Sequence, residues 1–140
     1  MTLISNNIAF DDNYYPLTVW KPAFGCVGKC FAYDAETDII AGYMIPEYVL
    51  GSVFNGKECF LLPKKYVKEF FETHTTSTIY MMNAKFDMFV VEKLCGFDFD
   101  SLIRKGQIID IGILYRLITL ATDSFVPQKN YSLDVLAATF

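Results

Sequence analysis

The chain has 140 residues, of which 53% are apolar and 16% aromatic, and its formal net charge is −4. A chain of this length forms one domain at most, and its apolar content excludes intrinsic disorder. The acidic balance argues against a protein that coats nucleic acid through a broad basic surface. It does not exclude an enzyme that meets phosphates with bound metals and a few lysines.

No stretch of the sequence resembles a targeting or membrane segment. Residues 1–7 lack the basic and apolar regions of a secretory signal, and the most apolar stretch, residues 108–121, contains Asp110 and Arg116. The four cysteines show no Cys-x-x-Cys spacing, and we interpret them as reduced thiols, with Cys30 and Cys59 as small core residues of strands. We therefore expect an intracellular, cytoplasmic protein without a membrane segment.

Residues 1–24 are polar, aromatic and irregular in pattern, and we expect them to form an extended N-terminal arm. Tyr14, Tyr15 and Trp20 could stack on nucleic-acid bases, but packing on the edge of the domain is the favoured interpretation. The domain itself is expected to span residues 25–140.

The next part of the chain predicts an antiparallel meander of three strands, at residues 27–34, 47–54 and 57–62. A bend is expected at residues 39–43, and Asn55-Gly56 is a strong hairpin signal between the second and third strands. Pro63 then opens a helix whose apolar positions repeat at helical spacing, while its lysines face solvent. The apolar positions are Tyr66, Val67, Phe70 and Phe71.

A fourth strand at residues 78–82 is predicted to run parallel to the first, because a helix connects this strand into the sheet. The helix predicted next, at residues 85–94, should turn Phe86, Phe89, Val90 and Leu94 inward. Asp98 and Asp100 follow it in a loop, where we interpret them as solvated turn carboxylates rather than metal ligands.

The remaining pattern predicts a short strand at residues 107–110 and a helix with an apolar stripe from Ile111 to Ala121. Asp110 is placed to cap that helix. A last helix is expected to begin after Asn130 or Ser132.

Two carboxylates stand where the first predicted strand ends. Asp34 and Glu36 are separated by one residue, so in a strand they point to the same face. Two neighbouring carboxylates repel each other unless one is protonated or a hard divalent cation binds both. A strand that simply runs into an acidic turn is the alternative, since a motif this short also occurs by chance.

A third carboxylate follows the fourth predicted strand. Asp87 falls in the first turn of the helix after Asn83, where the helix dipole tolerates negative charge. Ligands of α/β folds bind at the carboxyl ends of parallel strands. We therefore expect Asp34, Glu36 and Asp87 to meet there and form a metal site.

Together the two stretches resemble the DEDD, or DnaQ-like, superfamily of 3′–5′ exonucleases, notably the proofreading domains of DNA polymerases. Asp34, Glu36 and Thr37 match the family motif Asp-x-Glu-Thr, and Asn83, Phe86 and Asp87 match the motif Asn-x-x-Phe-Asp. The segment at residues 131–137 is similar to a later helix of such domains, so the resemblance covers roughly residues 25–140.

The resemblance implies an α/β fold of the RNase H-like type, a mixed sheet flanked by helices. It also implies hydrolysis of the terminal phosphodiester at the 3′ end of DNA with two Mg²⁺ or Mn²⁺ ions. In this scheme Asp34 bridges the two ions, Glu36 binds the ion that carries the nucleophile, and Asp87 holds the second. Asn83 and Phe86 shape the substrate site, and Thr37 contacts the terminal nucleotide.

The family's third motif, with a fourth carboxylate and a Tyr or His a few residues before it, has no match before Phe140. His74 precedes the second motif and cannot be the family's catalytic histidine. The chain thus resembles an exonuclease domain cut short, which a polymerase or a C-terminal exonuclease fragment would complete.

Two other functions stay open. One is an inactive RNase H-like module that binds nucleic acid or a protein partner. The other is an RNase H-like nuclease that cuts inside strands, against which the second motif argues.

Overall fold

The computed structural model describes residues 7–10, 12–38, 46–124 and 132–139. Seven strands and five α-helices lie in these ranges, together with a 3₁₀ turn at Pro22–Phe24. The strands are β1 (Asn7–Phe10), β2 (Asn13–Val19), β3 (Cys30–Thr37), β4 (Tyr48–Phe54), β5 (Cys59–Leu62), β6 (Thr78–Met81) and β7 (Ile108–Asp110). The helices are α1 (Lys64–Thr73), α2 (Ala84–Cys95), α3 (Asp100–Arg104), α4 (Ile111–Asp123) and α5 (Leu133–Thr139).

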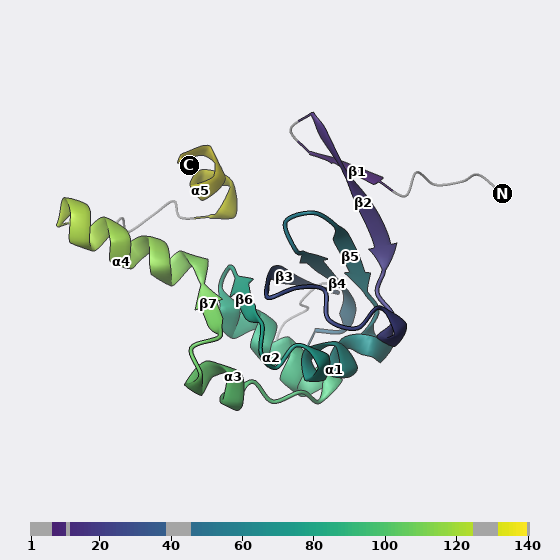
Figure 1. The fold of residues 1–140 in the computed structure, drawn as a ribbon. Coiled ribbons are helices and arrows are strands. Elements are labelled where there is room, and N and C mark those ends of the chain that lie inside the picture. Colours follow the sequence, from purple (N-terminus) through teal and green to yellow (C-terminus); the bar gives the residue numbers. More distant parts are fainter. Residues whose placement is uncertain (1–6, 11, 39–45, 125–131, 140) are drawn as a thin grey trace.

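One mixed sheet organises the molecule, with the strand order β1-β2-β5-β4-β3-β6-β7. The predicted meander is confirmed, because β3 pairs antiparallel with β4 and β4 antiparallel with β5. The predicted parallel strand is confirmed too, since β6 pairs with β3, and β7 continues the sheet parallel to β6. Helices α1 and α2 pack against this sheet, which gives the RNase H-like arrangement expected from the sequence (Figure 1).

The turn between β4 and β5 follows the Asn-Gly signal. Gly56 adopts a φ of 91°, which favours glycine, and the side chain of Asn55 accepts hydrogen bonds from the backbone N–H groups of Lys57 and Glu58. The loop spans residues 55–58, so it is longer than the two-residue connection that the sequence suggested. The bend predicted at residues 39–43 lies outside the described residues.

The N-terminal region differs from its prediction as an irregular arm. β1 and β2 form an antiparallel pair, and β2 joins the sheet edge parallel to β5. Trp20 is 0% exposed and donates its indole N–H to the carbonyl of Gly25. Tyr15 packs edge-on against Phe54, whereas Tyr14 is exposed. Packing, rather than base stacking, therefore explains Tyr15 and Trp20.

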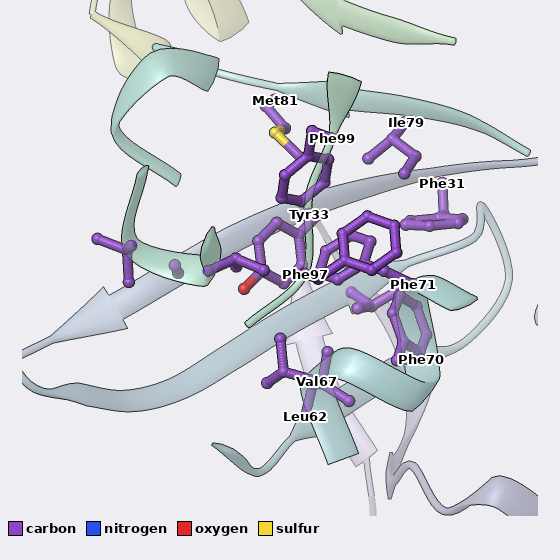
Figure 2. Packing of buried hydrophobic residues seen from close by; sticks show 14 of the residues in the cluster. Phe31, Tyr33, Leu62, Val67, Phe70, Phe71, Ile79, Met81, Phe97 and Phe99 are labelled. Carbon is purple, nitrogen blue, oxygen red and sulfur yellow. The ribbon is translucent and has the colours of Figure 1, made fainter. Parts of the chain in front are cut away.

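The hydrophobic core lies between one face of the sheet and helices α1 and α2 (Figure 2). Phe71 of α1 packs edge-on against Tyr33 of β3 and Phe99, and it stacks on Phe97. Val67, Phe70 and Phe71 are fully buried, which confirms the apolar face predicted for this helix. The segment just before α3, which the sequence predicted to be a loop, thus contributes two core rings. The one-turn helix α3 itself was not predicted.

Two expectations about buried side chains are wrong. Phe89 of α2 is 42% exposed, while Ala84, Asp87, Val90 and Val91 face the core in its place. Cys30 is exposed because β3 begins at Cys30 and alternates from there, so that Phe31, Tyr33 and Ala35 point inward. All four cysteines are free, in agreement with their interpretation as thiols.

The other face of the sheet carries a hollow of about 390 Å³ next to Asp34. Ala32, Ser52, Leu61 and Tyr80 form part of its floor, and Ile111 and Leu133 reach it from α4 and α5. Among the described residues, no helix is long and apolar enough to cross a membrane.

Candidate active site

Asp34 and Glu36 occupy neighbouring positions on the open face of β3. Both side chains are exposed, and Ala35 between them is buried, as the alternation of a strand requires. The expected side-by-side placement is therefore confirmed. Both residues lie within the strand, which continues to Thr37 with a register shift against β4 between Glu36 and Thr37.

Asp87 reaches the same strand from helix α2. It lies in the first turn of α2, is 2% exposed, and its Oδ1 accepts the backbone N–H of Ala35 at 2.8 Å. β6 pairs with β3 only as far as Ala32, so Asp87 satisfies a strand N–H beyond the end of β6. The fold thus ties Asp87 to the residue between Asp34 and Glu36.

The environment of Asp87 disfavours the ionised form of its carboxyl group. Burial raises the pKa of Asp87 to about 7, against the opposing effect of the hydrogen bond from Ala35. The negative charges of Asp34 and Asp110 raise this pKa further. Asp87 therefore exchanges a proton near neutral pH, as is common for groups that work in active sites.

Asp110 holds the starts of two helices. Its Oδ1 accepts the N–H of Ile113 at 3.2 Å, which confirms the predicted cap of α4. Its Oδ2 accepts the N–H of Ala84, the first residue of α2, at 2.8 Å. The sequence does not reveal the second bond, because it joins residues 26 positions apart and no local pattern predicts it. Asp110 thereby fixes the helix turn that carries Asp87.

The three predicted substrate-binding residues lie on or next to the elements that carry these carboxylates, β3 and α2. Thr37 is the half-buried last residue of β3. Asn83 is exposed and adopts a left-handed conformation, with φ of 59°, just before α2, and Phe86 packs partly against the core. Asn83 and Phe86 also line a hollow of about 290 Å³ together with Lys85 and Phe89. The structure therefore places both residues of the second motif at a surface where a ligand could bind.

Other polar residues considered from the sequence have structural roles. Asp98 accepts the N–H of Asp100, and Asp100 pairs with Arg104, in agreement with their interpretation as turn carboxylates. His74 is buried, and its Nε2 accepts the N–H of Val27 at 2.8 Å. Burial lowers the pKa of His74, so it stays neutral and serves the fold.

The donor chemistry fits a hard divalent cation, because a positive charge would relieve the repulsion between Asp34 and Asp87. Within the described part of the chain, however, no three His, Cys, Asp or Glu residues are grouped so that they could hold a metal ion. Asp34, Glu36 and Asp87 therefore do not form a ready three-ligand group, although the charge of Asp34 acts on Asp87. Asp87 is buried and bound to the backbone N–H of Ala35, whereas Asp34 and Glu36 are exposed.

No family model matches the sequence, and no curated protein is significantly similar to it. Solved structures do resemble the fold. The EXO domain of Nibbler from Aedes aegypti matches with a TM-score of 0.63 and 12% identity, over 84% of this chain and 64% of that domain. The catalytic core of RRP6 from Trypanosoma brucei matches with a TM-score of 0.54 and 15% identity, over 85% of this chain and 38% of that structure.

These likenesses support the RNase H-like fold, a mixed sheet flanked by helices. The chain spans less than two thirds of the length of either solved structure. At such low identity the likeness identifies the architecture, and activity has to be argued from the site.

Proposed function

We propose that this chain is the core of a metal-dependent 3′–5′ exonuclease that removes nucleotides from the 3′ end of single-stranded nucleic acid. The observation that carries the proposal is the contact of Asp87 with Ala35, which brings one acidic motif to the strand of the other. It is supported by the two matched motifs, by their order in the chain, and by the likeness of the fold to the Nibbler EXO domain.

In this proposal Asp34, Glu36 and Asp87 hold one or two Mg²⁺ or Mn²⁺ ions. The bound ions supply an activated water and stabilise the charge on the leaving oxygen. Asn83, Phe86 and Thr37 position the terminal nucleotide. Asp87 would offer a carboxylate oxygen to the cation while its Oδ1 keeps the hydrogen bond from Ala35.

Activity of the chain by itself should be low. The family resemblance implies a fourth carboxylate and a Tyr or His that orients the water, and the described residues group no additional ligand with Asp34 and Asp87. Proton transfer and orientation by such groups contribute roughly 10²–10⁴ in rate. We therefore propose that a further segment or partner, such as a polymerase, completes the site. The sequence resemblance favours DNA as the substrate.

The test is cleavage of 5′-labelled single-stranded DNA and RNA oligonucleotides in Mg²⁺ or Mn²⁺. We expect slow shortening from the 3′ end, stopped by EDTA and by Asp34→Asn. Asp123→Asn is the matched control, because Asp123 is an exposed aspartate at the far end of α4. Cleavage of circular single strands would instead identify an enzyme that cuts internally. If the Asp34→Asn variant still removes nucleotides one at a time from the 3′ end, the proposed site is wrong.

The open alternative is a non-catalytic module that binds nucleic acid. The absence of a three-ligand group among the described residues favours it, since Asp87 is buried whereas Asp34 and Glu36 are exposed. Oligonucleotide binding without cleavage at any metal concentration, with and without added C-terminal exonuclease sequence, would establish this alternative.

A further inference from the structure

The exposed Phe89 is not explained by packing. A phenylalanine in the middle of a helix on a sheet normally faces the core, yet 42% of Phe89 is exposed to solvent. Residues three and four positions apart share a helix surface, so Phe89 lies beside Lys85 and Phe86. All three line the hollow of about 290 Å³ that begins at Asn83.

The chemistry of this hollow is that of a nucleotide subsite. Phe86 is anchored against the core, while Phe89 leaves an aromatic surface in solvent on which a base can stack. The described residues offer Lys85 no ion pair, so its ammonium group is available to a phosphate. Asn83 adds an amide that can donate and accept hydrogen bonds.

The size and charge of the neighbouring surface restrict the occupant. Pockets that enclose a whole small molecule have volumes of roughly 300–1,000 Å³, so a hollow of about 290 Å³ fits a single base with its phosphate. A second hollow of about 380 Å³ shares Lys85 and Phe89 with the first and continues toward α3, where Glu92, Lys93, Asp98 and Asp100 also line it. Because three of these four charged side chains are carboxylates, the first hollow is the more favourable place for a phosphate.

We propose that Lys85 and Phe89 form a subsite for one nucleotide of a single-stranded substrate, with the base on Phe89 and the phosphate on Lys85. This inference rests on the proposed function, because Lys85 lies in the same first turn of α2 as Asp87. It adds two residues that bind substrate without taking part in the chemistry.

The experiment is fluorescence anisotropy with short 5′-labelled oligothymidylate and oligouridylate in Ca²⁺, with Phe89→Leu and Lys85→Gln. Phe89→Leu should weaken binding roughly 10-fold, because it removes the stacking surface but keeps an apolar side chain. Lys85→Gln should weaken binding several-fold and reduce the slope of log K against log salt by about 0.7. The DNA and RNA arms distinguish the sugar that the subsite accepts.

Two matched variants complete the design. Lys93→Gln removes the same charge from the same helix, where the lysine is 3.9 Å from Glu92. Phe24→Leu removes an exposed ring near the N-terminus, 52% exposed. Neither should change binding. If Phe89→Leu and Lys85→Gln bind the oligonucleotides as tightly as the wild type, the proposed subsite is wrong, while the proposed function stands. Absence of wild-type binding to both oligonucleotides would overturn the two together.

Discussion

The side chain of Asp87 accepts the backbone N–H of Ala35 at 2.8 Å, and this bond joins the two acidic motifs across 52 positions of sequence. It fixes α2 against the strand that presents Asp34 and Glu36. It also places a buried carboxyl group next to the charge of Asp34, and this makes the stability of the fold depend on pH.

Asp87→Asn should stabilise the metal-free protein at alkaline pH. The folded-state pKa of about 7 lies above the ordinary value of 3.8, so between these values the native state binds more protons than the unfolded state. Stability therefore falls as pH rises through this window. The asparagine keeps an oxygen for Ala35 but cannot ionise. We expect a gain on the order of 1–3 kcal/mol at about pH 8 and none near pH 4.

The measurement is urea denaturation in EDTA at several pH values, with Asp123→Asn as the control for loss of a surface charge. A difference between Asp87→Asn and wild type that does not vary with pH would show that Asp87 does not titrate in this range.

Asp34→Asn should leave the metal-free fold intact. Asp34 is exposed on β3, and its charge raises the pKa of Asp87. Its removal should lower the pKa of Asp87 below about 7, and the melting temperature in EDTA should be equal to or higher than that of wild type. Carboxyl-carbon NMR titration and thermal melts check the two effects. A clearly lower melting temperature would assign Asp34 a structural role.

Asp110→Ala should destabilise the fold, because one side chain caps the starts of both α2 and α4. The loss of a helix cap costs about 0.5–2 kcal/mol, so we expect about 1–3 kcal/mol for the two bonds. Denaturation at about pH 5 is the suitable measurement, since Asp87 is then protonated and gains nothing from the removal of a neighbouring charge.

Asp98→Ala is the comparison for Asp110→Ala, as the side chain of Asp98 accepts one hydrogen bond, from the N–H of Asp100 at the exposed start of α3. An equal loss in both variants would mean that Asp110 acts as an ordinary local cap and does not fix the turn that carries Asp87.

Much of the fold was predictable because its signals are local. Alternation about Ala35, the Asn55-Gly56 turn and the helical spacing from Tyr66 to Phe71 each depend on a few neighbouring residues. The parallel pairing of β2 with β5 could not be read in this way, because it depends on a distant strand edge and on the burial of Trp20.

In the candidate site, too, local features could be predicted and long-range contacts could not. The acidic motifs could be found in the sequence, but not the hydrogen bond that holds Asp87 at Ala35 or the second bond of Asp110 to Ala84. The inward placement predicted for Phe89 failed because the helix turns Asp87, Val90 and Val91 to the sheet instead. A polar residue on the buried side of a helix shifts the apolar stripe, and hydrophobic spacing alone does not reveal that shift.

Mn²⁺ should stabilise the wild-type protein, and more at about pH 8 than near pH 5.5. Metal ligands bind in their ionised form, and the pKa of Asp87 is about 7, so a cation must displace its proton at the lower pH. If the dissociation constant is on the order of 1 mM, 10 mM Mn²⁺ stabilises by about 1.4 kcal/mol. Thermal melts with and without Mn²⁺ at both pH values measure this effect. Asp34→Asn and Glu36→Gln should reduce the stabilisation, and Asp98→Asn should not.

Equal stabilisation of the wild type and all these variants would mean that Mn²⁺ binds elsewhere on the acidic surface. A larger effect at the lower pH would contradict Asp87 as a ligand, because its proton competes with the metal for the same oxygen.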